Sequence, residues 1–178
     1  MIIRIENFLS KEDYDICWEE ISKPGVFPKR KPTERRNDRI YRKDGPLLEI
    51  IRKNFKLHDN MRVNIHTTMF NKTSLINFHN DVGEGSEKLR YNKSWIFQFN
   101  IYFRKNSPFE GGNFELDRGD GKIESIEPKD NECVMFVSGM SHSISPITEG
   151  DRYTLGGFVL YDNDCLFSEY ETQEGDNE

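Results

Sequence analysis

The sequence contains no apolar run that approaches the roughly 20 residues needed to cross a bilayer. Its first residues, Met1 to Glu6, lack the basic start and the apolar stretch of a secretory signal. Only three cysteines are present, Cys17, Cys133 and Cys165, and they are widely spaced without a CxxC pattern. An odd, scattered set favours reduced thiols over a disulfide framework. These absences predict a soluble, intracellular (cytoplasmic) protein with no membrane partner.

The length of 178 residues is most simply that of one domain with its own core. The formal net charge of −6 is unevenly spread, because residues 162–178 hold many acids and neither lysine nor arginine. The rest of the chain is therefore nearly neutral. We expect a single domain over residues 1–161, followed by a solvated acidic C-terminal tail over residues 162–178.

Helical signals are confined to the first third of the chain. Ser10 precedes an acidic turn, and apolar residues then recur at spacings of three and four, which predicts a helix over residues 11–22. A proline near the start and a similar apolar stripe predict a second helix over about 46–57. Between them, residues 24–45 are rich in Lys, Arg and Pro, and we interpret them as a basic loop or flap.

From residue 61 the apolar period changes from that of helices to that of strands. The strongest strand runs from Trp95 to Arg104, and because neither of its faces is wholly polar, we expect it inside the structure. About eight short strands follow from the pattern up to Leu160. The sequence therefore predicts an α+β, mainly β fold, in which N-terminal helices (1–60) buttress a jelly-roll type core (61–161).

A candidate metal site emerges from three residues. In an extended segment His79 and Asp81 point to the same face, and His142 is the best candidate for a third ligand. Two imidazoles and one carboxylate make the facial triad of non-heme Fe(II) oxygenases, which leaves open positions for a cosubstrate and O2. Further along, Arg152 and Thr154 share a strand face, and a guanidinium with a hydroxyl suits the distal carboxylate of a dicarboxylic cosubstrate.

At this point the chain resembles a known family. The run from His142 to Leu155 is similar to the distal motif of prolyl-4-hydroxylase-type Fe(II)/2-oxoglutarate dioxygenases: His, Pro-Val-Thr, Gly, then Arg-Tyr-Ser-Leu. Ile147 replaces Val, Thr154 replaces Ser, and Gly111-Gly112 matches a glycine pair of the family. The resemblance implies a double-stranded β-helix, of the jelly-roll and cupin-like kind, over about residues 61–161.

The resemblance also implies the cofactors and the reaction. Fe(II) would be bound by His79, Asp81 and His142, and 2-oxoglutarate by Arg152 with help from two hydroxyls, those of Thr154 and Tyr102. O2 would take the last coordination position, 2-oxoglutarate would be decarboxylated to succinate, and a substrate C–H bond would be hydroxylated. Ascorbate often supports this family by reducing the iron again.

The substrate is less constrained by the sequence. The resemblance implies a prolyl or other residue of a peptide or protein, and the basic segment 29–43 could meet an acidic substrate; the same segment could contact nucleic acid, which we do not favour. A free amino acid, small metabolite or nucleobase, hydroxylated or demethylated, is the alternative within the enzyme class. A non-catalytic β-barrel binding domain is the alternative outside it.

The chain also departs from the family pattern around the expected site. Phe70 stands where many members carry a tyrosine that contacts the cosubstrate, and Phe158 stands where a tryptophan is usual. Two further histidines receive structural interpretations. His58 closes the second helix, where a cation is mildly favoured, and His66 has no paired carboxylate nearby in the sequence, which argues against a ligand role.

Overall fold

The computed structural model describes residues 2–28, 37–59, 61–72, 74–81, 95–137 and 139–160. The elements follow along the chain as β1 (Ile2–Ile5), α1 (Lys11–Ser22), β2 (Asn37–Arg42), α2 (Pro46–Phe55), β3 (Arg62–Phe70), β4 (Ile76–His79), β5 (Trp95–Tyr102), β6 (Phe109–Gly111), β7 (Phe114–Asp117), β8 (Ile123–Ile126), β9 (Cys133–Phe136), β10 (His142–Ile144), β11 (Ile147–Gly150) and β12 (Arg152–Leu160). The acidic tail and residues 29–36 of the basic segment lie outside the described residues.

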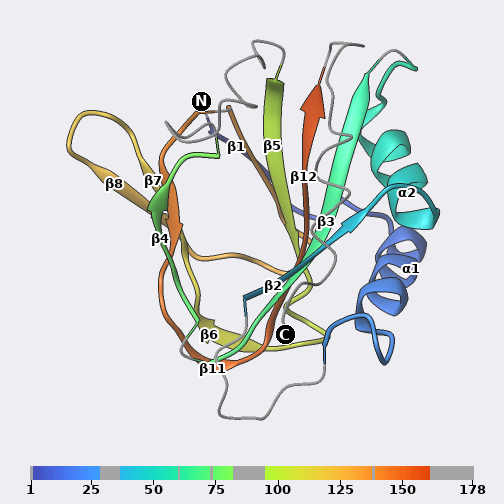
Figure 1. Cartoon of the computed structure of the whole chain (residues 1–178), viewed down its shortest axis with the longest axis horizontal. Coiled ribbons are helices and arrows are strands. Elements are labelled where there is room, and N and C mark those ends of the chain that lie inside the picture. Colours follow the sequence, from blue (N-terminus) through green and yellow to red (C-terminus); the bar gives the residue numbers. More distant parts are fainter. Residues whose placement is uncertain are drawn as a thin grey trace, which may run out of the picture.

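Two antiparallel sheets face each other, and the helices cover the outer side of the larger one (Figure 1). The larger sheet has the strand order β1-β9-β5-β12-β3-β2, and the smaller has the order β4-β10-β7-β8. A two-stranded ribbon, β6 with β11, lies at the lower end of the view in Figure 1. This arrangement is the double-stranded β-helix that the sequence predicts, so the fold class is confirmed.

The two faces of β5 and β12 explain how one sheet serves both the core and a site. On β5, Phe99 and Ile101 belong to the apolar core shared with the helices, and on β12 Leu155 does the same. Successive side chains of a strand alternate between faces, so the residues between them point to the space between the sheets. These inward residues are largely polar, which is unusual for the buried side of a sheet.

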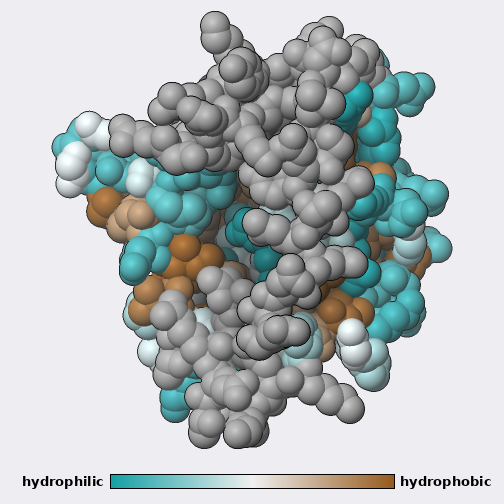
Figure 2. Space-filling view, in the orientation of Figure 1, coloured by the Kyte–Doolittle hydropathy of each residue, from teal (hydrophilic) through white to brown (hydrophobic). Residues whose placement is uncertain are grey.

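The helices pack against the outer face through narrow apolar stripes. Ser10 caps α1 by accepting a hydrogen bond from the backbone N–H of Asp13, as the sequence predicts. Pro46 opens α2, where its missing N–H is harmless. Asp13 also accepts hydrogen bonds from Lys53 and Asn54, which ties the two helices together. Their outer surface is mostly hydrophilic (right side of Figure 2).

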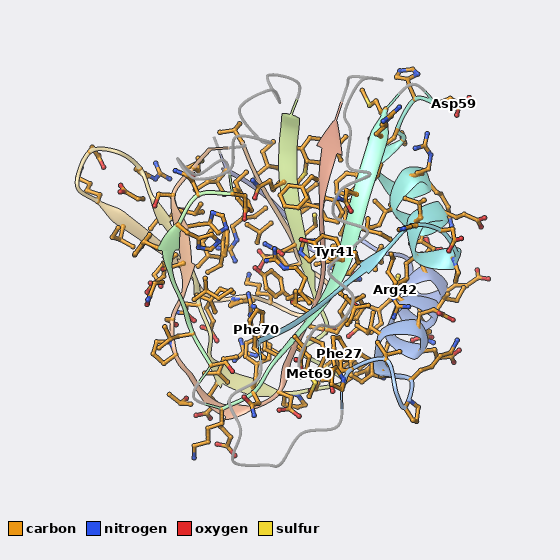
Figure 3. All side chains as sticks on the ribbon, in the orientation of Figure 1. Phe27, Tyr41, Arg42, Asp59, Met69 and Phe70 are labelled. Atoms are coloured by element: carbon orange, nitrogen blue, oxygen red, sulfur yellow. The ribbon has the colours of Figure 1, made fainter. Side chains whose placement is uncertain are left out.

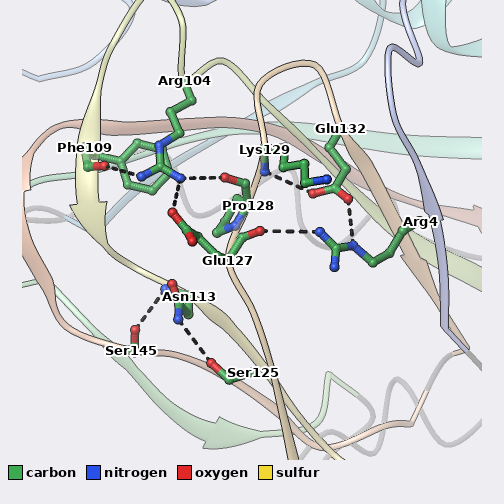
Figure 4. A network of polar contacts seen from close by, with 10 residues as sticks. All are labelled: Arg4, Arg104, Phe109, Asn113, Ser125, Glu127, Pro128, Lys129, Glu132 and Ser145. Carbon is green, nitrogen blue, oxygen red and sulfur yellow. Dashed lines mark hydrogen bonds and ion pairs between the residues drawn. The ribbon is translucent and has the colours of Figure 1, made fainter.

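A polar network fixes the turn before β9 (Figure 4). The guanidinium of Arg104 donates to Glu127 and to the carbonyl of Pro128, and it lies 5.1 Å from the ring centroid of Phe109. On the other side, Arg4 pairs with the fully buried Glu132 at 2.6 Å. This network ties β1 and the end of β5 to the turn before β9.

Several element predictions need correction. Residues 37–42 of the basic segment form the strand β2 and not a loop, because they pair with β3 along the edge of the larger sheet. The short strands β6 and β11, which pair with each other, have no alternating pattern and were not predicted. The strand that carries His79 ends at that residue, so Asp81 lies in the following turn. In the described part of the chain, no helix is both long and apolar enough to span a membrane.

Candidate functional site

Three potential metal ligands gather at the edge of the smaller sheet. His79, Asp81 and His142 offer ligand atoms that all lie within 4.8 Å of one another. One carboxylate oxygen of Asp81 lies 3.6 Å from Nε2 of His79, and the other lies 3.5 Å from Nε2 of His142. The pairing of β4 with β10 places the two histidines directly opposite each other in the sheet. Residues far apart in the sequence thus form one set of N and O donors.

The second nitrogen of each imidazole orients the first. Nδ1 of His79 lies 2.9 Å from the carbonyl of Asn77, and Nδ1 of His142 lies 2.9 Å from the carbonyl of Met140. A carbonyl oxygen can only accept, so both Nδ1 atoms carry the proton and both Nε2 lone pairs face Asp81. Burial lowers the pKa of His142, which favours the neutral, metal-binding form. This donor set fits a divalent transition metal such as Fe(II).

A buried cation lies on the opposite sheet. Arg152, at the start of β12, is 1% exposed, and its Nε has no hydrogen-bond partner. Its guanidinium lies 5.0 Å from the ring centroid of Tyr102 and 5.6 Å from that of Phe70; Phe70 is labelled in Figure 3. Among the described residues no carboxylate pairs with this charge. Burial lowers the pKa of Arg152 from its ordinary value, the expected effect on a cation without an anion.

Hydroxyl groups surround this cation. Thr154 and Thr68 lie opposite each other on β12 and β3, and their hydroxyls are hydrogen-bonded. Tyr102 pairs with Thr154 from the other side, and its buried hydroxyl faces Arg152 and has no other hydrogen-bond partner. Burial raises the pKa of Tyr102 to about 12, an effect that the charge of Arg152 partly offsets. A buried guanidinium with an unpartnered Nε, next to a hydroxyl that faces only this cation, is a site prepared for an anion.

The glycine pair shapes the wall next to Arg152. A Cβ at Gly112 would lie 3.1 Å from Cδ of Arg152 and 2.9 Å from Cγ1 of Ile147, and one at Gly111 would lie 2.3 Å from the carbonyl oxygen of Pro146. Both glycines have positive φ angles, of 70° and 63°. Only glycine fits such a close approach of β6, β11 and the arginine side chain.

The two histidines of the triad and the cation line one open pocket, whose empty volume is about 340 Å³. Its walls come from β3, β5 and β12 of the larger sheet and from β4, β7 and β10 of the smaller one, with one residue of β2. The lining residues are Arg39, His66, Thr68, Phe70, Ile76, His79, Asn100, Phe114, His142, Ile144, Arg152 and Thr154.

The family is decided by a match to a protein-family model. The sequence model of the 2OG-Fe(II) oxygenase superfamily matches residues 62–160, which is more than half of the chain. The chain belongs to the 2OG-Fe(II) oxygenase superfamily. This oxygenase is therefore a 2-oxoglutarate-dependent dioxygenase, and the family implies Fe(II) and 2-oxoglutarate as its cofactor and cosubstrate. None of the curated proteins matches the sequence.

Solved structures share the fold of this oxygenase at low sequence identity. A viral collagen prolyl hydroxylase from Paramecium bursaria Chlorella virus-1, in complex with 2-oxoglutarate, is 16% identical with a TM-score of 0.65, over 91% of this chain and 96% of that one. A prolyl-4-hydroxylase from Pseudomonas putida is 15% identical with a TM-score of 0.61, over 91% and 93%. A prolyl hydroxylase from Trichoplax adhaerens, in complex with a hypoxia-inducible-factor peptide fragment, is 12% identical with a TM-score of 0.59, over 88% and 82%.

The structure brings the predicted site residues of this oxygenase together, and their roles as ligands stay predictions. His79, Asp81 and His142 form the triad, Arg152 and Thr154 line the same pocket, and Tyr102 packs against Arg152. His58 is exposed beyond α2, away from the pocket, in line with its structural interpretation.

Sequence reasoning missed four polar residues of the pocket: Thr68, Asn100, Arg39 and His66, the last of which was considered only as a metal ligand. One signal could have found three of them. On two strands, every second residue is polar and the residues between them are mostly apolar. The polar positions are Asn64, His66 and Thr68 on β3 and Gln98 and Asn100 on β5. When a strand is covered on both faces, a polar residue at every second position of the strand indicates a functional site.

Proposed function

We propose that this oxygenase binds Fe(II) through His79, Asp81 and His142 and holds 2-oxoglutarate with its distal carboxylate on Arg152. The observation that supports this most strongly is the buried guanidinium, which has no carboxylate partner among the described residues and lines the same pocket as His79 and His142 of the triad. A buried charge without a partner is costly for folding, and a dianionic cosubstrate explains why it is retained.

Each residue of the site then has a definable task. His79, Asp81 and His142 would hold Fe(II), which would supply open coordination positions for the oxo-acid end of 2-oxoglutarate and for O2. Arg152 fixes the far end of the cosubstrate, and the hydroxyls of Thr154 and Tyr102 can donate to the same carboxylate. Phe70 and Phe114 line the pocket with apolar rings and limit the access of water.

For the substrate we propose a residue of a peptide or protein, with proline as the first candidate. The support comes from the similar structures, which are prolyl hydroxylases by their names, one of them in complex with a peptide. A free amino acid or other small molecule is the second candidate, since the pocket is open and nothing in its described lining requires a peptide. Ascorbate would act as a supporting reductant in either case.

The activity is tested without knowledge of the substrate. Purified protein supplied with Fe(II), 2-oxoglutarate and O2 is expected to form succinate, and His79→Ala is expected to abolish it. His58→Ala, which removes an exposed imidazole outside the pocket, is the matched control and should retain the wild-type rate. Equal succinate formation by His79→Ala would contradict the assigned triad.

The substrate class is tested by mass spectrometry. Proteins of the source cells are compared with and without the enzyme for residues that gain one oxygen atom, a mass increase of about 16 Da. Hydroxylated prolines that depend on 2-oxoglutarate would support the first candidate. If no protein gains oxygen while succinate still forms, the peptide proposal fails and the small-molecule candidate takes its place.

A further inference from the structure

A row of polar residues crosses the larger sheet at the pocket. It lies next to the row of Thr68, Thr154 and Tyr102, which is proposed to contact the cosubstrate. Strand pairing sets Asn100 opposite Gly156 and Gly156 opposite His66, with Tyr41 beyond on β2. Asn100 and His66 both line the pocket, and Tyr41 is labelled in Figure 3 on the β2 side of it. The proposed function assigns no task to this row.

Gly156 leaves space between the two polar side chains. A Cβ placed on it would lie 2.7 Å from Oδ1 of Asn100 and 2.8 Å from Nε2 of His66. The side-chain amide and the imidazole therefore lean toward each other over a residue without a side chain. Any larger residue at position 156 would push them apart, so the glycine keeps both polar ends at the pocket.

One ring nitrogen of His66 has no hydrogen-bond partner in the protein. His66 is 5% exposed, and its buried Nδ1 has no hydrogen-bond partner. Burial, together with the charge of Arg39, holds the pKa of His66 well below its ordinary value, so the ring is neutral and carries one N–H. A buried polar group without a partner normally reflects a functional requirement.

A positive charge stands at the mouth of the same pocket. Arg39, on β2, lies opposite Thr68, its side chain is exposed, and it lines the pocket. Its charge lowers the pKa of both His66 and His142, which places it in electrostatic reach of the row and of the triad. Within the described ranges, no acidic side chain forms an ion pair with Arg39.

When Fe(II) and 2-oxoglutarate are bound, no negative charge of the site is left to neutralise Arg39. Fe(II), the carboxylate of Asp81, dianionic 2-oxoglutarate and the guanidinium of Arg152 together are neutral. Arg39 then adds a positive charge beside two side chains that can donate hydrogen bonds, Asn100 and His66. A carboxylate is the ligand group that matches a guanidinium flanked by N–H donors.

We propose that Arg39, His66 and Asn100 form a substrate subsite that selects substrates with a carboxylate close to the hydroxylated carbon. The inference rests on the proposed function, because it places this carboxylate beside the proposed Fe(II) and 2-oxoglutarate site. The carboxylate belongs either to an acidic residue of a peptide or to a small carboxylic acid. Arg39 attracts the group, and His66 and Asn100 orient it over Gly156.

The test compares carboxylates with their amides. One arm is a peptide library made by proteolysis of a cell extract, used directly or after its carboxyl groups have been converted to amides. The other arm is a mixture of free amino acids and small carboxylic acids, with the corresponding amides. Both are incubated with Fe(II), 2-oxoglutarate and O2, and products that gain oxygen only when 2-oxoglutarate is present are measured by mass spectrometry.

Wild-type enzyme is expected to oxidise carboxylates at least about tenfold better than amides in one of the two arms, which identifies the source. Arg39→Gln should remove the preference, and Arg39→Glu should reverse it. Lys56→Gln, a charge loss on the exposed end of α2, should keep it. Each rate is divided by the concentration of enzyme that has iron and 2-oxoglutarate bound, so that a variant with weaker binding of either is not mistaken for one with a changed substrate preference.

The proposal is overturned if amides are oxidised as well as carboxylates, or if Arg39→Gln keeps the preference. It is also overturned if neither arm gains oxygen while the same samples form succinate, an outcome that leaves the proposed binding of Fe(II) and 2-oxoglutarate intact. Absence of succinate would refute the proposed function, and with it this subsite.

Discussion

Replacement of Arg152 by methionine is expected to change stability and ligand response in opposite directions. The side chain is 1% exposed and unpaired by any described carboxylate, so desolvation of its charge opposes folding by several kcal/mol. Contacts with the rings of Tyr102 and Phe70 return about 2 kcal/mol. Arg152→Met should therefore make the ligand-free protein about 1–2 kcal/mol more stable, which raises Tm by roughly 2–8 °C for a chain of this size.

The same change should remove the response to 2-oxoglutarate. Loss of one partner of a buried charge pair costs about 3–4 kcal/mol, or a roughly 10²–10³-fold weaker affinity. Wild-type protein at a concentration of cosubstrate about 100 times Kd gains about 2.7 kcal/mol. At that concentration the variant should gain almost nothing.

Thermal unfolding with and without 2-oxoglutarate measures both effects, with Mn(II) in place of Fe(II) in every sample to prevent turnover. Arg104→Met is the matched control. Its guanidinium is well bonded to Glu127 and Pro128, so this variant should lose stability and keep the response to 2-oxoglutarate. A less stable Arg152→Met protein whose Tm still rises with cosubstrate would refute the assignment of Arg152.

Three further outcomes are expected. Thr154→Val removes a hydroxyl beside the proposed carboxylate site and should raise KM for 2-oxoglutarate about tenfold, whereas the exposed Thr148→Val should not. Burial raises the pKa of Cys17 to about 12 and also raises that of Cys133, so neither thiol of the folded protein should react with iodoacetamide at about pH 8; rapid labelling of either, read by peptide mass spectrometry, would contradict this burial. Because the pKa of His66 is depressed in the folded state, the unfolded chain takes up a proton below about pH 6.5 that the folded chain does not, and stability should fall as pH decreases from there. His66→Gln should flatten this dependence in urea unfolding, and an unchanged slope would count against a neutral buried imidazole.

The sequence predicted the parts of the fold whose signals are local. The helix after Ser10 has a cap and an apolar stripe, and β5 has strict alternation, so both were identified from short windows. Strand β2 was missed because a run of basic residues has no apolar face of its own. It becomes a strand by pairing with β3, a contact between segments that no local pattern encodes.

The residues of the candidate site also fall into those that local sequence signals identify and those that only the fold brings together. The triad and Arg152 could be inferred because each is a residue type with distinctive chemistry in a recognisable run. Thr68 and Asn100 appear in the sequence only as polar positions of alternating strands, and their place in the pocket depends on β12 lying between β3 and β5. That order brings Thr68 onto Thr154 and Asn100 onto Gly156. Ordinary polar residues thus become site residues only through the sheet order and register.

The account rests on one metal ion held by three side chains beside one bound cosubstrate. Anaerobic titration of the protein with Fe(II) in the presence of 2-oxoglutarate tests this most directly. We expect a weak metal-to-ligand absorption band that saturates at one iron per chain and that is absent from His142→Ala. A titration with no band, or an equal band in that variant, would contradict the account.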